Sequence, residues 1–468
     1  MPPLLAAILG GGRAYALDVT VKHGSSVRGW ILWAAFHKSM RTSVSRRSAR
    51  GGRQLLTVHT EEGSVAITAR PRRRFRADWG VQDFIDWAVQ NEVNYVVLRW
   101  PEDLPDLADE DDLDILVADE DIEKVLSVVE DKSTAGVACD VYSVSGRLGT
   151  KYKGVPYYPP HLAKKILDGA VRQGNVPVPS REHYFYSLAY HAVYHKGRRS
   201  DLSRNEEKKR TSADSTSKHS HFDALCALRD ELGLSVSIDF ESLADFLHDN
   251  AWEPGLDLLR KLGEKNGWVR RLYEKRAAAR EAIDGIGVIV LRNWAVRKGL
   301  VPQILVRLQQ AGFIIVAVHE LTGERQATAH AYLRGGNWGS SREYPINSGG
   351  PAMLIAVFDP TPRPVAEADR AQYPHMSNGR IIEIKRELRS MMNKGRKPNA
   401  LVNSLHTSDD ESEAVYYLEL IVPDVLPSVR KVVAKLDKRR MRDLQPFVKR
   451  VVRRVRRAVR QGGVGTAA

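Results

Sequence analysis

A histidine with an asparagine, hydroxyl groups and carboxylates around it lies near residue 406 of this 468-residue chain. The stretch is Asn403-Ser404-Leu405-His406-Thr407-Ser408-Asp409-Asp410. An imidazole can act as a nucleophile or as a proton carrier. Serine and aspartate are good helix N-caps, and a helix N-terminus offers free N–H groups to an anion. The stretch therefore predicts either a phosphate-facing histidine or a capped helix that follows a structural histidine.

Two carboxylates alternate in a second stretch, Asp112-Leu113-Asp114, at the start of a predicted strand. Alternate residues of a strand point to the same face of the sheet. Asp140 lies on a later predicted strand and would supply a third carboxylate. Three such ligands suit Mg²⁺ held against the phosphates of a nucleotide. The alternative is a solvated acidic loop between strands.

His191 and His195 have the i, i+4 spacing that puts both rings on one face of a helix, as in a zinc site. The glutamate of the H-E-x-x-H pattern is missing, and aromatic residues surround the pair. We therefore interpret the two histidines as a packing pair, with a metal site as the alternative.

Hydrophobic periodicity predicts the elements that hold the carboxylates and the histidine pair. Strands and helices alternate over residues 79–178, which predicts a compact α/β unit. Its predicted strands are 95–98, 113–117 and 136–142, and its predicted helices lie near 84–89 and 122–129. Residues 179–283 are predicted to be mostly helical, with a charged, serine-rich and disordered loop at 197–221.

A second α/β region begins at residue 284 and ends near 424, just after the His406 stretch. Strands are predicted at 286–291, 313–318 and 352–358, helices at 300–311 and 378–392, and irregular chain at 322–349. The β-α-β start, with more strands and helices behind it, predicts a ferredoxin-like sheet of the split β-α-β type. The His406 stretch is expected to open the next helix.

The first α/β unit resembles nucleotidyltransferase-fold proteins of the polymerase-β type. The segment Tyr95-Val96-Val97-Leu98-Arg99 and then Asp112-Leu113-Asp114-Ile115-Leu116-Val117 carry this resemblance. It implies a Mg²⁺ site at Asp112, Asp114 and Asp140 and a nucleotidyltransferase activity. Arg99-Trp100 replaces the Gly-Gly or Gly-Ser of the loop that accommodates the triphosphate in that family.

The second α/β region is similar, in four segments and in the same order, to nucleoside diphosphate kinases. The first segment, Leu291–Val301, is similar to a strand end followed by K-P-D-x-x-x-x-G-L-V, and the second is the turn Ala311-Gly312-Phe313. The third, Ser348–Met353, is similar to S-G-P-V, and the fourth, Asn403–Asp409 with Ala414, is similar to N-x-x-H-G-S-D. Jointly these matches are more specific than any one of them.

The kinase resemblance implies that His406 attacks the γ-phosphate of a nucleoside triphosphate and passes the phosphoryl group to a diphosphate, with Mg²⁺ as cofactor. Asn403 would contact ribose or phosphate, and Ser408 would support the histidine through hydrogen bonds. Further phosphate-binding candidates are Arg292, which replaces the lysine of the family, and Arg380, Arg386 and Arg389 on the preceding basic helix.

Four positions depart from the kinase pattern. Asn293-Trp294 replaces Pro-Asp, and Thr407 replaces a glycine beside the histidine. Tyr417 stands where the family has a glutamate that orients the histidine. Active phosphotransfer, nucleotide binding without turnover and an unrelated α/β domain therefore remain as alternatives.

Composition and charge limit the partners. The net charge of +14 favours anionic partners, and 43% apolar residues are enough for several cores. Two cysteines are too few for a disulfide framework or a thiolate cluster, which predicts a reducing compartment and a cytoplasmic protein. No apolar run approaches the ~18 residues that a membrane span needs.

Both ends of the chain are basic. Residues 1–78 are arginine-rich with weak periodicity and are predicted to be poorly ordered. In the tail, 425–468, valines on one face and arginines on the other predict an amphipathic helix. Such a helix is typical of binding to an acidic membrane surface or to nucleic acid, with a solvated tail as the alternative.

The sequence as a whole predicts a multidomain α/β protein: a basic N-terminal segment, a nucleotidyltransferase-like α/β unit, a helical segment, a kinase-like ferredoxin-fold domain and a basic helical tail. Its first predicted function is phosphotransfer with nucleoside tri- and diphosphates as partners. A nucleotidyltransferase and a non-catalytic nucleotide-binding or scaffold protein are the alternatives. An oligomer is compatible with the sequence.

Overall fold

The computed structural model describes residues 72–436 except 106, 108–111, 134–135, 148, 198–199 and 203–219, together with four earlier strands. These strands are β1 (Leu17–Val21), β2 (Ser43–Ala49), β3 (Arg53–Thr60) and β4 (Gly63–Ala69), in the antiparallel order β1-β4-β3-β2. Much of the N-terminal segment that was expected to be poorly ordered lies outside the described residues. The chain divides into two compact units, Met1–Glu253 with Asn266–Val269, and Pro254–Lys265 with Arg270–Ala468.

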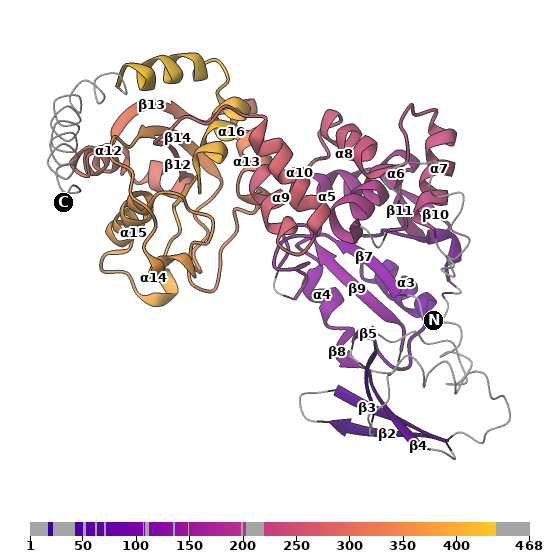
Figure 1. Cartoon of the computed structure of the whole chain (residues 1–468). Coiled ribbons are helices and arrows are strands. Elements are labelled where there is room, and N and C mark those ends of the chain that lie inside the picture. Colours follow the sequence, from indigo (N-terminus) through magenta and orange to yellow (C-terminus); the bar gives the residue numbers. More distant parts are fainter. Residues whose placement is uncertain are drawn as a thin grey trace, which may run out of the picture. The chain divides into compact units, whose positions relative to one another are not determined.

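The first unit contains a five-stranded mixed sheet. Its strands are β5 (Arg72–Phe75), β6 (Tyr95–Val97), β7 (Asp112–Val117), β8 (Val129–Ser133) and β9 (Ala138–Ser143), in the order β6-β7-β9-β5-β8. Only β7 and β9 run parallel. The apolar faces of α3 (Val81–Gln90) and α4 (Ile122–Leu126) pack on this sheet (Figure 1). β5 belongs to the sheet although it lies before the predicted start of this unit at residue 79.

Helices make up most of the rest of the first unit. They are α5 (Pro160–Asp168), α6 (Arg181–Tyr190), the π-helical turn η2 (His191–Lys196), α7 (His221–Leu232) and α8 (Phe240–Asp249), with the hairpin β10 (Ala170–Gln173) and β11 (Val176–Pro179) between α5 and α6. The predicted boundary at residue 178 therefore falls inside β11. Most of the predicted loop 197–221 lies outside the described residues.

The second unit is built on a four-stranded antiparallel sheet. Its strands are β12 (Ile286–Arg292), β13 (Ile314–Glu320), β14 (Pro351–Phe358) and β15 (Leu405–Thr407), in the order β13-β14-β12-β15. β13 follows β12 through α11 (Asn293–Arg297) and α12 (Val301–Gln310), and β15 follows β14 through α14 (Glu367–Arg370) and α15 (Gly379–Asn393). This order and these directions are compatible with a ferredoxin-like split β-α-β sheet.

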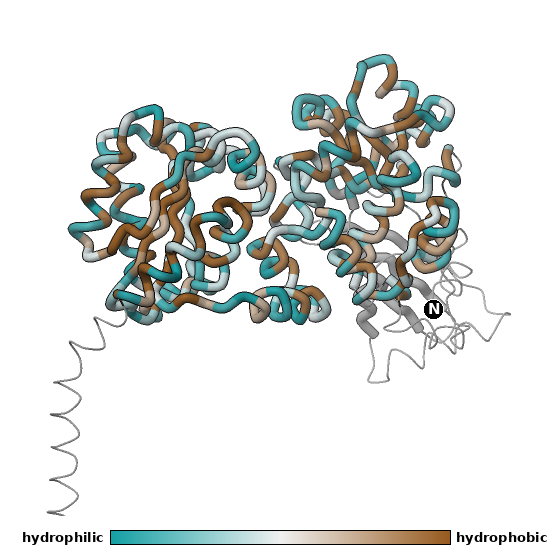
Figure 2. Tube along the Cα trace, turned by 90° about the horizontal axis from the view of Figure 1, so that it is seen from above, coloured by the Kyte–Doolittle hydropathy of each residue, from teal (hydrophilic) through white to brown (hydrophobic). Residues whose placement is uncertain are grey.

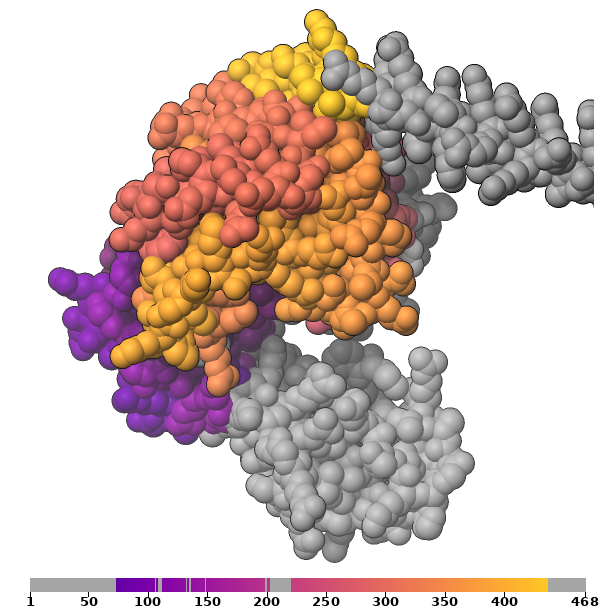
Figure 3. All heavy atoms as spheres, turned by 90° about the vertical axis from the view of Figure 1, so that its left-hand side faces the viewer, coloured from indigo at the N-terminus to yellow at the C-terminus, as the bar shows by residue number. Residues whose placement is uncertain are grey.

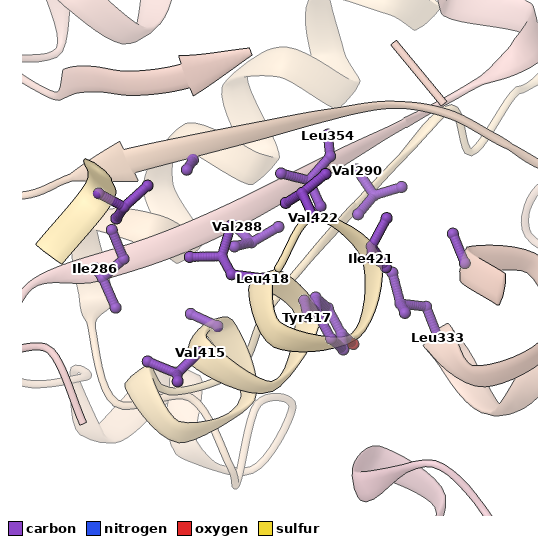
Figure 4. Close-up of a cluster of buried hydrophobic side chains, with 14 of the residues drawn as sticks. Ile286, Val288, Val290, Leu333, Leu354, Val415, Tyr417, Leu418, Ile421 and Val422 are labelled. Carbon is purple, nitrogen blue, oxygen red and sulfur yellow. The ribbon is translucent and has the colours of Figure 1, made fainter. Parts of the chain in front are cut away.

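Alternation along the central strands gives this sheet two buried faces. Ile289 and Leu291 face a core with α12 and α15, whereas Val288 and Val290 face a core with α13 (Gly323–Tyr332) and α16 (Glu411–Ile421). Burial on both faces explains why β12 is an unbroken apolar run. Figure 4 shows α16 with its Leu418 against this second face, and Figure 2 shows the hydrophobic strands inside the unit.

The second unit begins earlier and ends later than its predicted range of 284–424. It includes α9 (Leu256–Gly263) and most of α10 (Gly267–Ala278), because the buried Arg260 of α9 pairs with carboxylates beside the His406 stretch. Residues 426–436 are helical, and Val429 and Val433 are buried in the core on the α16 face. Consecutive segments from salmon to yellow form one surface of this unit in Figure 3. The valine stripe of the predicted tail lies outside the described residues.

One further difference concerns the segment between β13 and β14. The segment 322–349 was expected to be irregular, but it contains α13 and the short turn η5 (Leu333–Gly336). Within the described part of the chain, no helix has both the length and the apolar character needed to cross a membrane.

Candidate functional site

His406 lies on β15, an edge strand that pairs with β12, and not in the helix that the sequence predicts. The helix follows one turn later: Asp410 caps α16 by accepting a hydrogen bond from the Glu413 amide at 2.8 Å. The amide of Asp409 donates to Glu413 Oε2 at 2.6 Å. Two amides at the start of α16, those of Asp409 and Glu413, are therefore satisfied by carboxylates of the same segment.

One nitrogen of the His406 ring is held by the protein. Nε2 lies 2.9 Å from the hydroxyl of Tyr417, which donates a hydrogen bond of 2.6 Å to Glu413 Oε1. No other hydrogen bond to the ring is formed within the described residues. The pKa of His406 is well below its usual value, first because of burial and then because of Lys385 and other cations. The ring is therefore neutral at physiological pH, as a nucleophile must be.

Four cations are close enough to His406 to lower its pKa. They are Lys385 and Arg389 on α15, Arg334 in η5 and Lys261 on α9. Lys385 is only 6% exposed and pairs with no carboxylate in the described structure. Burial, and then Arg389, lower the pKa of Lys385 to about 8. Asp409 and Glu413 act in the opposite direction, and the ammonium lies 5.5 Å from the centroid of the Tyr373 ring. A buried cation without an ion pair is costly, so this cluster would be stabilised by an anion.

The ring of Trp338 lies beside His406 and two arginines. Its centroid is 6.4 Å from that of His406, with the rings edge to face. The guanidinium carbons of Arg292 and Arg334 lie 5.8 and 5.9 Å from the Trp338 centroid. One buried indole thus holds two arginines and the histidine together, and the π-face partly compensates the cations.

Arg292 is placed to brace the site rather than to hold a phosphate. Its side chain is 1% exposed and donates to the carbonyls of Gly349 at 2.6 Å, of Asn403 at 3.0 Å and of Trp338. Burial, and then Arg334, lower its pKa to about 9. It therefore ties the His406 strand to the loop before β14 and adds positive potential to the site.

Of the three arginines predicted on α15, only Arg389 is near His406. It shares a face with Lys385 because the two residues are four apart. Arg380 is bound to Asp359, Thr361 and the Ala311 carbonyl, and Arg386 donates to Asp369 and lies over the Tyr373 ring. Both are therefore occupied away from the histidine.

Three polar atoms beside the cluster are buried and lack a hydrogen-bond partner among the described residues. They are Asn403 Oδ1, Arg334 Nη1 and Arg389 Nε. Buried polar groups are normally satisfied, so these three atoms are available to bind the polar groups of a ligand. Arg334 also has a left-handed backbone, with φ of 57°, a strain that is found most often at functional sites.

Ser408 and Thr407 hold the strand rather than the histidine ring. Ser408 Oγ accepts a hydrogen bond from the Val288 amide at 3.1 Å, and the Ser408 amide donates to the Val288 carbonyl at 2.9 Å. Thr407 is 1% exposed and its hydroxyl is unpartnered in the described structure. The predicted support of His406 by Ser408 is thus indirect, through the register of β15 on β12.

The carboxylates near His406 do not fit a resident Mg²⁺. Asp409 and Asp410 pair with Arg260, and Glu413 accepts from Tyr417 and from the Asp409 amide. Their oxygens are thus already occupied by donors, and no cluster of three or more metal-ligating side chains is found where the structure is described.

The three predicted metal ligands of the first unit lie on one face of the sheet, although they do not form a metal-binding cluster in the described structure. Asp114 of β7 is directly paired with Asp140 of the parallel strand β9, so both point to the face that Asp112 shares. The Tyr142 hydroxyl lies 3.5 Å from Asp114 Oδ1 and 3.3 Å from Asp140 Oδ2. Burial first, and then Asp112 and Asp140, raise the pKa of Asp114 to about 7, against the opposing effect of Arg99.

Arg99 supplies the positive charge that a metal would bring. Its guanidinium forms a buried ion pair with Asp114 and donates to the Tyr157 hydroxyl at 2.9 Å. This arginine stands where the nucleotidyltransferase family has its small loop residues. With Asp114 paired in this way, the donor set does not fit Mg²⁺.

His191 and His195 pack inside the first unit. His191 Nδ1 is hydrogen-bonded to Tyr157, and His195 Nε2 lies 2.8 Å from the Tyr157 carbonyl. Burial lowers the pKa of both, that of His195 to about 3. These contacts agree with the interpretation of a packing pair.

Sequence reasoning did not find Lys385, Arg334, Trp338 or Glu413 as site residues. One signal was present for Lys385, which interrupts the apolar stripe Ile381, Ile384 and Leu388 of α15. Charged residues on a buried stripe are rare unless paired or functional. Arg334 and Trp338 come from the segment that was expected to be irregular, so no periodicity pointed to them.

Comparison with known proteins gives little. No family model matches the chain, and no curated protein matches it. Among the solved structures that match is a crystal structure of the Aquifex aeolicus nucleoside diphosphate kinase, 18% identical, with a TM-score of 0.18. The match covers 29% of this chain and 93% of that chain. A likeness this weak assigns neither a fold nor a function.

Proposed function

We propose that the second unit is a phosphotransferase that moves the γ-phosphoryl group of a nucleoside triphosphate through a phosphohistidine at His406. The observation that carries the proposal is the neutral His406 ring, with one nitrogen anchored, beside a cluster of cations that form no ion pair among the described residues. The four segments that resemble nucleoside diphosphate kinases support it. They fall on β12 with α11, at the turn between α12 and β13, at the start of β14, and on β15 with α16.

In the proposed reaction, the free ring nitrogen Nδ1 attacks the γ-phosphorus. The N–P bond forms as the bond from the γ-phosphorus to the bridging oxygen breaks, and the nucleoside diphosphate leaves with that electron pair. In the second half, a diphosphate oxygen attacks the phosphohistidine and the nitrogen recovers its lone pair. Lys385, Arg389 and Arg334 would neutralise the phosphate oxygens, and Asn403 Oδ1 would accept from ribose or an ordered water. The nucleotide is proposed to enter as its Mg²⁺ complex.

Radiolabelling tests this function. The wild-type chain incubated with γ-labelled ATP and Mg²⁺ is expected to carry label that acid removes and base does not, and a nucleoside diphosphate is expected to discharge it. His406→Ala is expected to abolish this label. His319→Gln, on β13 of the same unit, is the matched control and is expected to label as wild type. Equal labelling of His406→Ala and wild type would overturn the proposal.

The alternative is nucleotide binding without turnover. It is identified by a wild-type chain that binds ATP in equilibrium dialysis but takes up no label at any pH between 6 and 9. Loss of that binding in Arg389→Met would then place the nucleotide at the same cationic cluster.

A further inference from the structure

Glu413 and Tyr417 form a hydrogen-bonded chain that ends on His406. The two residues are four apart on α16 and therefore share one helical face. Glu413 is 1% exposed and Tyr417 is fully buried, so the chain is shielded from bulk water. Its two links measure 2.6 Å from Tyr417 to Glu413 and 2.9 Å from Tyr417 to His406.

We infer that Glu413 selects the tautomer of His406 through the hydroxyl of Tyr417, and so makes Nδ1 the attacking nitrogen. The inference rests on the proposed function for its catalytic meaning, although the tautomer is a property of the protein without nucleotide. Glu413 and Tyr417 are positioning residues, since they act on phosphate only through the ring.

The positions of the protons explain how Glu413 selects the tautomer of His406. The tyrosine hydroxyl has one hydrogen. When Glu413 is ionised, this hydrogen is donated to the carboxylate, and the Tyr417 oxygen must accept from the ring. Nε2 then carries the proton, and Nδ1 keeps its lone pair for the phosphorus. When Glu413 is protonated, the carboxyl donates to Tyr417, Tyr417 donates to Nε2, and the ring proton moves to Nδ1.

Neighbouring charges set the pH at which the hydrogen bonds from Glu413 through Tyr417 to His406 reverse their direction. Burial first, and then Asp409, raise the pKa of Glu413 to about 8, with Asp257 acting in the same direction and Arg260 against it. The pKa of Tyr417 is raised well above its usual value, so this residue keeps its proton throughout. Around the ring, the cations Lys385, Arg334, Lys261 and Arg389 keep the imidazole neutral whether Glu413 is protonated or ionised. The attacking form of the ring is therefore favoured as pH rises through about 8.

The variant Glu413→Gln is expected to show the tautomer opposite to that of wild type at high pH. The Asp409 amide donates to Glu413 Oε2 at 2.6 Å, so in Glu413→Gln the amide oxygen must take this position. The NH₂ group then faces Tyr417 and donates to it. In Glu413→Gln the His406 ring therefore carries its proton on Nδ1 at every pH. In Tyr417→Phe no hydrogen bond to Nε2 favours either tautomer.

Nitrogen NMR of histidine-labelled full-length chain, without nucleotide, reads the tautomer directly. We expect wild type to change from the Nδ1–H form at pH 6.5 to the Nε2–H form at pH 9.5, Glu413→Gln to remain Nδ1–H, and Tyr417→Phe to show no pH-dependent change. The matched controls Tyr416→Phe and Glu419→Gln lie on the same helix and are expected to behave as wild type. A wild-type ring with the same tautomer at both pH values would overturn the inference, as would variants that follow wild type.

The rate of labelling by ATP is the second readout. It is expected to rise with pH through about 8 in wild type, to fall about 100-fold in Glu413→Gln and about tenfold in Tyr417→Phe, with the pH dependence lost in both. Rates in Glu413→Gln that match wild type would reject the positioning role. Absence of label on wild type with the NMR pattern intact would reject the proposed function and leave the tautomer selection standing.

Discussion

At the scale of single residues, the unusual feature of the site is a lysine in a core position. Lys385 lies on the buried face of α15 and its pKa falls from 10.5 to about 8. Because a pKa difference of one pH unit corresponds to 1.36 kcal/mol, Lys385 lowers the folding stability of the empty protein by about 3 kcal/mol below pH 8. Proteins retain such costs at functional sites, where a ligand offsets them.

Lys385→Met is therefore expected to stabilise the empty second unit by about 1–3 kcal/mol near pH 7, because methionine fills similar space without charge. The difference from wild type should shrink between pH 8 and 10.5, where the folded lysine is already neutral and the unfolded one is still charged. Urea unfolding at pH 7 and pH 10 measures it. ATP affinity should fall at least tenfold at pH 7 in the same variant.

Arg386→Met is the matched control for Lys385→Met. Arg386 is exposed, on the same helix, and pairs with Asp369 at the surface, so its removal should change stability by less than about 1 kcal/mol and leave ATP affinity unchanged. A destabilised Lys385→Met with normal ATP affinity would show that the lysine serves the fold and not an anion.

At the scale of elements, α9 fixes the end of the chain segment that carries His406. The guanidinium of Arg260 is 8% exposed and faces Asp409, Asp410 at 3.4 Å and Glu413 at 3.8 Å. Three carboxylates at one helix N-terminus repel one another, and a single arginine compensates them all. The start of α16, and with it the chain from Glu413 to the ring, thus depends on a helix about 150 residues earlier.

Arg260→Met is expected to destabilise the second unit by about 3 kcal/mol, since it leaves partly buried carboxylates without a cation. The loss should be smaller at pH 4, where these carboxylates take up protons. Hydrogen exchange of the α16 amides measures both effects. Arg280→Met, which removes the more exposed pair with Glu419, should cost about 1 kcal/mol or less. Equal protection of α16 in Arg260→Met and wild type would contradict this dependence.

Elements were easier to predict than the site within them. The strands β12, β13 and β14 and the helices α12 and α15 follow from apolar runs and amphipathic stripes, and each was expected within one or two residues of its bounds. β15 was missed because three residues carry no readable periodicity, and α13 because alanines and polar residues blur its stripe. The cations around His406 come from α15, η5 and α9, and no pattern along the chain shows that these segments meet.

At the scale of the whole molecule, the candidate sites of the two compact units differ in how their buried charges are compensated. In the first unit, the carboxylates that would bind a metal face a built-in cation, Arg99. In the second unit, Lys385 and the other cations around His406 form no ion pair among the described residues, although Asp409 and Glu413 act on Lys385 from a greater distance. This contrast supports the proposed phosphate chemistry of the second unit and favours a structural role for the carboxylates of the first.

Asp114→Asn separates these assignments. If Asp114 is the partner of Arg99, its loss leaves a buried guanidinium unpaired and should destabilise the first unit by about 3–5 kcal/mol, seen as faster hydrogen exchange in β7 and β9. Labelling at His406 should stay at the wild-type rate, because the two groups lie in different compact units. Asp119→Asn is the matched control, since Asp119 is half-buried and its pair with Arg147 is 4.0 Å long. If wild type instead releases pyrophosphate from nucleoside triphosphates and Asp114→Asn abolishes this with normal exchange, the first unit is a nucleotidyltransferase and Arg99 must leave Asp114 when nucleotide binds.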